Sequence, residues 1–217
     1  SKNDGKIKNE SRAFKKNYKK EFIHNKHKIT NKSRQVSPDM LDKKNIAEQI
    51  NSQKGSKKLQ KILVNLEDGD PEISLIFQAV LPSLGKITNH NFGNYFCQIL
   101  LQRISPSERK TAWKFYTRRN LLDYALHHFG NHSIQSLIGA VSSTSEQIFV
   151  MTQLEKHFNM LSFNQNGSQI LQRLITNFQE EATQCLVDYI KTNFYSLSTH
   201  GIAYNISKKF IIFWSSQ

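Results

Sequence analysis

Residues 90–100 read HNFGNYFCQIL, and similar stretches return at 127–137 as HHFGNHSIQSL and at 164–174 as NQNGSQILQRL. In each stretch a glycine is followed by a small polar residue and, four positions after that residue, by a glutamine. The recurring glycines, spaced by 38, 37, 37 and 34 residues, are Gly55, Gly93, Gly130, Gly167 and Gly201. A period in this range predicts a helical repeat protein, in which each unit buries its apolar face against its neighbours.

Residues that favour helix N-caps recur with a similar period. They are Asp70 before Pro71, Ser105 before Pro106, Ser143 and Asn177. A glutamate follows each of the last three after three residues (Glu108, Glu146 and Glu180), which predicts capping boxes. Amphipathic runs with apolar residues at three- and four-residue spacing come next. One repeat is therefore expected to contain a short helix, a middle helix that begins at the glycine, and a capped third helix.

Positive charge is concentrated at the front of the chain. Residues 1–61 hold 18 Lys+Arg and 6 Asp+Glu, a net charge of +12, whereas residues 62–217 hold 12 and 11, a net charge of +1. Residues 1–49 show no sustained apolar period, so we expect a disordered basic arm there and a repeat domain over residues 50–217. Such an arm keeps a protein soluble, tethers nucleic acid or serves as a nuclear-import signal.

Several classes of function find no support in the sequence. The longest apolar run, FIIFW at 210–214, is too short to span a bilayer, so no membrane association is expected. The histidines and two cysteines lack metal-ligand spacing. Phosphate-loop, nucleophile-elbow and zinc-protease motifs are absent. We therefore expect no catalytic residue, no metal and no cofactor, and no enzyme activity.

The middle helices repeat one polar pattern. In GNYFCQIL, Asn94 and Gln98 stand at i and i+4 and share a face, with Tyr95 beside them, while Phe96 and its apolar neighbours turn toward the core. We expect the polar pair to lie outside that core. The same triplet of positions recurs three more times, as Asn131, His132 and Gln135, as Ser168, Gln169 and Gln172, and as Ser56, Lys57 and Gln60.

Amides and rings in this order suit an unpaired nucleotide. An amide offers a donor and an acceptor together, which matches a base edge. A flat ring beside it gives the base a stacking surface, worth roughly 1–3 kcal/mol per base. Each unit would thus contact one nucleotide. The alternative is that these polar side chains only tie neighbouring helices together.

The stretches FGNYFCQ, FGNHSIQ, NGSQILQ and KGSKKLQ resemble repeats of the Pumilio/FBF (PUF) family, and the resemblance extends over residues 50–206. It implies an all-α, right-handed superhelical solenoid of three-helix repeats that binds single-stranded RNA. It also implies that Asn94 with Gln98, and Asn131 with Gln135, contact uracil while Tyr95 and His132 stack.

By the same resemblance, Ser168 with Gln172 and Ser56 with Gln60 contact adenine, in an RNA that runs antiparallel to the repeats as 5′-A-U-U-A-3′. Gln169 and Lys57 replace the usual stacking residue, which should weaken contacts with the outer two bases. The fifth unit, HGIAYNI at 200–206, places Ile202, Ala203 and Ile206 at the base-contacting positions, and we expect a degenerate or capping unit after about four recognisable repeats.

The resemblance implies a cytoplasmic monomer that binds uridine-containing 3′ untranslated sites in mRNA and recruits protein partners for translational repression or decay. The number of visible repeats is lower than is usual in the family, so we expect a fragment or a shortened paralogue. Two alternatives stay open: a nuclear or nucleolar Pumilio-like protein that binds ribosomal RNA by charge without sequence specificity, and an α-solenoid protein scaffold.

Overall fold

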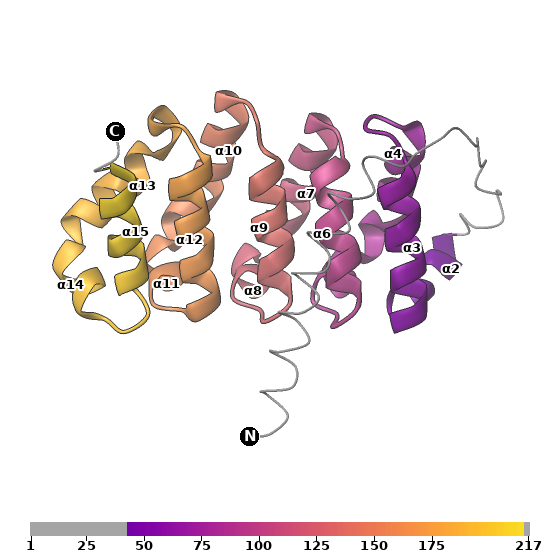
Figure 1. Ribbon diagram of the computed structural model, residues 1–217, viewed down its shortest axis with the longest axis horizontal. Helices are drawn as coiled ribbons and strands as arrows, with labels where there is room; N and C mark the ends of the chain where they lie inside the picture. Colours follow the sequence, from indigo (N-terminus) through magenta and orange to yellow (C-terminus); the bar gives the residue numbers. More distant parts are fainter. Residues whose placement is uncertain (1–42, 215–217) are drawn as a thin grey trace, which may run out of the picture. The chain divides into compact units, whose positions relative to one another are not determined.

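The computed structural model describes residues 43–214, which form helices and their connections with no strand among them. The prediction of a disordered basic arm falls mainly on residues 1–42, which lie outside the described residues. Over residues 43–214 the all-α prediction is confirmed, and the helices follow one another as repeated units (Figure 1).

The units are built from helices of three kinds. The short helices are α2 (Lys43–Ile50), α5 (Leu84–Thr88), α8 (Leu121–Ala125), α11 (Phe158–Ser162) and α14 (Phe194–Thr199). The middle helices are α3 (Gln53–Asn65), α6 (Gly93–Arg103), α9 (Gly130–Ala140), α12 (Gln165–Asn177) and α15 (Tyr204–Trp214). The third helices are α4 (Pro71–Val80), α7 (Pro106–Arg118), α10 (Thr144–Leu154) and α13 (Glu180–Thr192). Single 3₁₀ turns, Leu81–Ser83 and Glu155–His157, lead into α5 and α11.

The middle helices stand side by side in chain order, so that α3, α6, α9, α12 and α15 form a middle row (Figure 1). The third helices α7, α10 and α13 contact one another in the same order and form an outer row. Between the rows lies the apolar core, in which Phe96 of α6 and Trp113 and Tyr116 of α7 are fully buried. Burial against the neighbouring unit is the main source of stability in such an array.

Helix α2 corrects the expected boundary of the repeat domain. Residues 43–49 belong to the predicted disordered arm, yet Lys43–Ile50 is helical. Ile46 and Ile50 stand at i and i+4 on this helix, are buried, and belong to a helix that packs on α3 and α4. Two apolar side chains on one face thus suffice to hold a short helix, although lysines dominate the surrounding composition.

Three of the four expected N-caps are confirmed. Asp70, Ser105 and Ser143 each accept a hydrogen bond from a backbone N–H in the first turn of α4, α7 and α10. Only Ser105 forms the complete capping box with Glu108. The assignment of Asn177 is wrong, because Asn177 is the last residue of α12.

Helix α13 instead begins after Gln179, which makes no side-chain cap. The previous unit supplies the hydrogen-bond partners of Gln179. Its backbone N–H donates to Oε1 of Gln147 at 2.9 Å, and its Oε1 accepts from the Thr144 hydroxyl at 2.6 Å. Because both partners belong to α10, the start of one outer helix is fixed by its neighbour.

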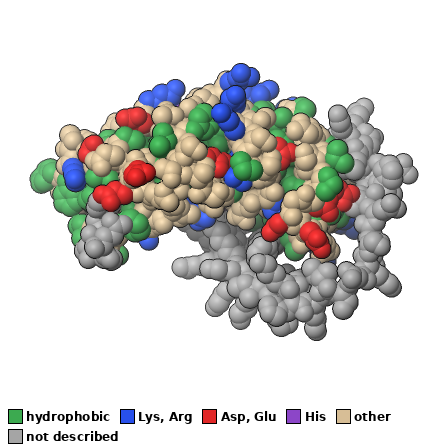
Figure 2. All heavy atoms as spheres, turned by 90° about the horizontal axis from the view of Figure 1, so that it is seen from above, with side chains coloured by type: hydrophobic (Ala, Val, Ile, Leu, Met, Phe, Trp, Pro, Cys, Tyr) green, Lys and Arg blue, Asp and Glu red, His purple; other side chains and the backbone are tan. Residues whose placement is uncertain are grey.

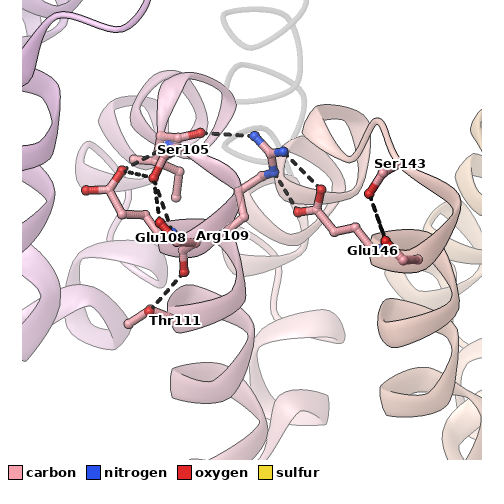
Figure 3. A network of polar contacts seen from close by, with 9 residues as sticks. Ser105, Glu108, Arg109, Thr111, Ser143 and Glu146 are labelled. Carbon is pink, nitrogen blue, oxygen red and sulfur yellow. Dashed lines mark hydrogen bonds and ion pairs between the residues drawn. The ribbon is translucent and has the colours of Figure 1, made fainter.

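An ion pair explains why the capping box at Ser143 stays incomplete. Glu146 turns away from the cap and accepts two hydrogen bonds from Arg109 of α7, Nε to Oε1 at 2.7 Å and Nη2 to Oε2 at 2.9 Å (Figure 3). Arg109 also donates from Nη1 to the carbonyl of Ile104 at 3.0 Å. Both side chains are about nine-tenths buried, so this bidentate pair joins α7 to α10 with little exposure to solvent.

The repeat glycines allow a close approach between each short helix and the middle helix that follows. A Cβ placed on Gly93, Gly130 or Gly167 would lie 2.7, 2.7 or 2.6 Å from the backbone carbonyl oxygen of the residue six positions earlier, namely Ile87, Tyr124 or Leu161. A methyl group cannot occupy that space unless the backbone moves. In contrast, a Cβ on Gly201 meets nothing within 4 Å, so Gly201 is not equivalent to the other repeat glycines.

We predict that Glu146→Ala lowers the free energy of unfolding by about 3 kcal/mol, because it leaves the Arg109 guanidinium buried without its carboxylate. Chemical denaturation followed by circular dichroism measures this loss. Replacing both residues with leucine should recover part of it, and Glu181→Ala, in the exposed first turn of α13, should have no measurable effect. Equal losses in the Glu146 and Glu181 variants would contradict the structural importance of the pair.

Gly130→Ala should destabilise the protein by roughly 1–3 kcal/mol, since the new methyl group overlaps the Tyr124 carbonyl. Gly201→Ala is the matched control, and its stability should stay close to wild type because the space around Gly201 is open. Thermal and urea unfolding of the two variants measures this difference in stability. Equal stabilities would show that the recurrence of glycine has no steric cause.

Candidate nucleic-acid interface

A side chain three residues before the repeat glycine caps each middle helix. His90 Nδ1 accepts hydrogen bonds from the backbone N–H groups of Phe92 and Gly93, both at 3.3 Å. The same arrangement recurs at His127, which accepts from Phe129 and Gly130 at 3.1 and 3.2 Å, and at Asn164, which accepts from Asn166 and Gly167 at 2.9 and 3.1 Å. His90, His127 and Asn164 therefore fix the junction between each short helix and the middle helix that follows.

The cap is followed at once by the first residue of each polar pair. Asn94 Nδ2 donates to the carbonyls of His90 and Asn91 at 2.8 and 2.9 Å, which uses both of its hydrogens. With 1% of its surface exposed, Asn94 is buried, so the expectation that the whole pair lies outside the core is wrong for this member. Hydrogen bonding to the loop backbone removes the cost of burying the amide.

The half-buried Gln98 is held by this buried asparagine. Its Nε2 donates to Asn94 Oδ1 at 3.0 Å. This bond fixes which end of the Gln98 amide carries the nitrogen, and it leaves Oε1 and the second N–H for a ligand. Tyr95 lies one position after Asn94 and is half-buried beside the amide.

Helix α9 repeats the arrangement with one addition. Asn131 Nδ2 donates to the carbonyls of His127 and His128 at 2.8 and 2.9 Å, and Gln135 Nε2 donates to Asn131 Oδ1 at 2.9 Å. Gln135 also donates to Oε1 of Gln169, on α12, at 3.3 Å. At this junction the polar side chains therefore tie neighbouring helices together, as the structural alternative expects, while Gln135 Oε1 stays available as an acceptor.

The remaining two pairs differ from each other. On α12, Gln172 Nε2 donates to the backbone carbonyl and hydroxyl of Ser168, both at 3.2 Å, and Gln172 is half-buried. On α3, Ser56 donates to the carbonyl of Phe92 at 2.9 Å and Gln60 donates to Ser56 at 2.9 Å. Only 1% of Ser56 and 6% of Gln60 is exposed. This first pair therefore joins α3 to the start of α6, and the structure does not place it at the surface.

The four stacking positions also divide into two kinds. Tyr95 and His132 are half-buried rings, whereas Gln169 and Lys57 are exposed and have no ring. The structure thus brings together, on the adjacent helices α6 and α9, two amide pairs that each have a ring beside them. The third pair, Ser168 with Gln172, follows on α12.

The fifth unit begins two residues later than the sequence predicts. His200 Nδ1 accepts from the backbone N–H groups of Ile202 and Ala203 at 3.2 and 3.4 Å, in the way that His127 accepts from Phe129 and Gly130. Ala203 therefore stands where the other units have glycine. Tyr204, Asn205 and Lys208 occupy the positions of Asn131, His132 and Gln135, in place of the expected Ile202, Ala203 and Ile206.

A sequence signal for this register did exist. The cap residues Ser52, His90, His127, Asn164 and His200 are spaced by 38, 37, 37 and 36 residues, a steadier period than that of the glycines. Ser52 accepts from the backbone N–H of Gly55, which completes the series. Caps constrain the backbone of every unit, whereas Gly201 merely lies near the position that the period predicts.

A family model described as the Pumilio-family RNA binding repeat matches residues 85–111, 120–150 and 157–191. These three segments coincide with the second, third and fourth units. The chain therefore contains Pumilio-family repeats. The Pumilio repeats that are matched are the ones that carry Asn94, Asn131 and Ser168.

Curated relatives and solved structures agree with this assignment. Two Pumilio domain-containing proteins of Schizosaccharomyces pombe are 26% and 27% identical over 77% and 62% of this chain, which spans 24% and 17% of their own lengths. The Puf4 RNA binding domain bound to a 3′ UTR recognition sequence of HO endonuclease RNA superposes with a TM-score of 0.71 at 23% identity, over 77% of this chain and 51% of that one.

The Puf3 RNA binding domain bound to a Cox17 RNA 3′ UTR recognition sequence gives a TM-score of 0.67 at 22% identity, over 79% of this chain and 47% of that one. At these identities the two structures establish the fold, and the prediction of a PUF solenoid is confirmed. The chain spans about half of each solved Pumilio domain.

The described residues hold neither a metal-binding cluster nor a membrane-spanning helix. Within residues 43–214, no group of three or more His, Cys, Asp or Glu side chains is placed to hold a metal ion. No helix in the same part of the chain is long and apolar enough to cross a membrane.

The cap of α9 is a titratable side chain. Burial, with a smaller contribution from the neighbouring His128, lowers the pKa of His127 below its ordinary value of 6.5. Protonated Nδ1 cannot accept the N–H groups of Phe129 and Gly130, and a positive charge at a helix N-terminus is unfavourable. The neutral form is therefore the one that the folded Pumilio repeat stabilises.

We predict that His127→Asn makes stability less sensitive to acid. Because the folded pKa is depressed, the unfolded state binds more protons, so the wild type loses stability as pH falls from 6.5 through the lower folded value. Asparagine caps α12 and does not titrate, so the variant should lose less, with His157, whose pKa is also lowered, still contributing to both proteins. Urea unfolding at several pH values in this window measures the free energy of unfolding. If His127 were not involved, this free energy would fall with pH equally in the wild type and the variant.

Proposed function

We propose that this protein binds single-stranded RNA along the middle row of its Pumilio repeats. The observation that carries the proposal is the arrangement on α6 and α9, where a buried asparagine orients a half-buried glutamine beside an aromatic or imidazole ring in two consecutive repeats. The similarity to the Puf4 and Puf3 domains, whose structures contain RNA, supports it.

The amide of Gln98 suits uracil. Its Oε1 can accept from N3–H of the base and its second N–H can donate to a carbonyl oxygen of the same base, while Tyr95 supplies a stacking surface. Gln135 with His132 offers the same set of groups once its bond to Gln169 opens. Ser168 with Gln172 follows the adenine pattern that the family resemblance implies. The proposed core is thus 5′-A-U-U-3′, read by α12, α9 and α6, and it omits the buried pair Ser56 and Gln60.

Electrostatics favour contacts with bases over contacts with phosphate in this region. Residues 62–217 carry a net charge of only +1. On the face shown in Figure 2, basic and acidic side chains are scattered among uncharged ones. Charge on residues 1–61 would add a salt-sensitive contribution that is independent of sequence.

In the cell, we propose that binding occurs in the cytoplasm at uridine-containing 3′ untranslated sites of mRNA. A monomer that recruits protein partners would then repress translation or promote decay. The second candidate is sequence-independent binding of ribosomal RNA in the nucleolus. It is favoured by Gln169 and Lys57, which lack stacking rings, together with the net charge of +12 over residues 1–61.

Selection of a randomised single-stranded RNA pool on the full chain distinguishes these candidates. If the protein selects bases, the retained RNA should be enriched in a short motif with adjacent uridines. Binding of this motif should persist in moderate salt. Binding by charge should retain RNA without a motif and fall steeply as salt rises. A protein scaffold should retain no RNA beyond what residues 1–49 hold.

Alanine at Asn94 and Gln98 together, or at Asn131 and Gln135 together, should weaken binding of the enriched RNA by about 1–3 kcal/mol, because each change removes the oriented amide of one repeat. Gln184→Ala, which removes an exposed amide from α13 in the outer row, is the matched control and should leave affinity unchanged. Fluorescence anisotropy gives the affinities. If neither double variant differs from the control, the proposal that these two repeats contact bases is wrong.

A further inference from the structure

The fifth unit presents the same geometry as the units before it. Helix α15 packs against α12 as the next member of the middle row. Its start is capped by His200 through the same pair of bonds to the backbone N–H groups two and three residues later that His127 makes. The backbone of α15 therefore begins in the register of α9, with Ala203 in the place of Gly130.

Burial along α15 follows this register. Ile206 and Ser207 are buried, as are Ser133 and Ile134 at the equivalent positions of α9. Asn205 is half-buried at the position of His132, and its Nδ2 donates to the carbonyl of Ile202 at 3.1 Å. The core face of α15 thus corresponds to that of α9.

A second, exposed face of α15 carries Tyr204 and Lys208. They stand at i and i+4, where α9 has Asn131 and Gln135. Tyr204 is 44% exposed, unlike Asn131 with 1%, and Lys208 is exposed as well. A large ring and an ammonium group therefore extend the line of base-contacting positions by one unit.

These two groups can hold a nucleotide but cannot identify its base. An exposed tyrosine ring stacks on any base. A lysine ammonium has donors and no acceptor, so it cannot match a base edge that presents a donor and an acceptor together, and it suits a phosphate oxygen. Lys208 replaces the glutamine that gives the other units their selectivity.

We infer that the fifth unit binds one further nucleotide of the same RNA strand, with its base stacked on Tyr204 and a phosphate oxygen contacted by Lys208, and without selecting the base. The inference rests on the proposed function. In the antiparallel order, this nucleotide lies immediately 5′ to the one that α12 contacts.

The test uses the full chain and labelled RNAs that contain the enriched core preceded by adenosine, by uridine or by an abasic nucleotide. Loss of the base should weaken binding roughly fivefold or more, whereas adenosine and uridine should bind alike. Tyr204→Ala should abolish the effect of the abasic nucleotide, and Tyr204→Phe should retain it. Thermal unfolding confirms that both variants are folded.

Lys208 has its own signature. Lys208→Ala should weaken binding of all three RNAs. It should also reduce the slope of log affinity against log salt by about 0.7, the value for one phosphate contact on a single strand. Lys191→Ala makes the same change of charge on α13, in the outer row, and should alter neither quantity.

The outcomes separate the inference from the function on which it rests. If the core RNA binds and depends on Gln98 and Gln135 while the abasic nucleotide changes nothing, the fifth unit is not a nucleotide site and the proposed function stands. A strong preference between adenosine and uridine also contradicts the inference, because it requires a base edge to be read. Absence of binding to the core RNA overturns both proposals.

Discussion

The close contact between a repeat glycine and a backbone carbonyl six residues earlier underlies the geometry of the middle row. Because glycine has no side chain, the short helix can lie directly against the start of the middle helix that follows, as at Tyr124 and Gly130. The cap residue and the first polar residue bind the same loop, His127 through Nδ1 and Asn131 through its amide hydrogens. Three contacts within residues 124–131 therefore reproduce the sequence period in the fold, and Asn131 in turn orients Gln135.

Much of this could be predicted from sequence because glycines, caps and i, i+4 pairs are local signals with local causes. The burial of Asn94 could not, since it depends on carbonyls that only the folded loop brings within reach. Asn177 resembles a cap in sequence, but α13 begins later because Gln147 and Thr144 of the previous unit satisfy Gln179. Contacts between units override local preference in such cases.

The ends of the array were harder to predict than its centre. Ile46 and Ile50 hold α2 in place, but the lysines around them make the segment read as polar. At the other end, Gly201 follows the glycine period although a Cβ on it would meet nothing within 4 Å, whereas His200 forms the cap. Each central unit packs against neighbouring units on both sides. A wrong register there would therefore disagree with the pattern of both neighbours. Among the described residues, the first and the last units each pack against one neighbouring unit, so fewer contacts fix their register.

The bond from Gln135 to Gln169 makes two adjacent units share one pair of amides. A ligand group that takes the donor of Gln135 releases Gln169, and a group that engages Gln169 releases Gln135. The cost of opening this bond is met once, so whichever position is filled first lowers the cost of filling the other. Under the proposed function, filling one of the two positions would therefore favour filling the other, and binding at α9 and at α12 would be thermodynamically linked.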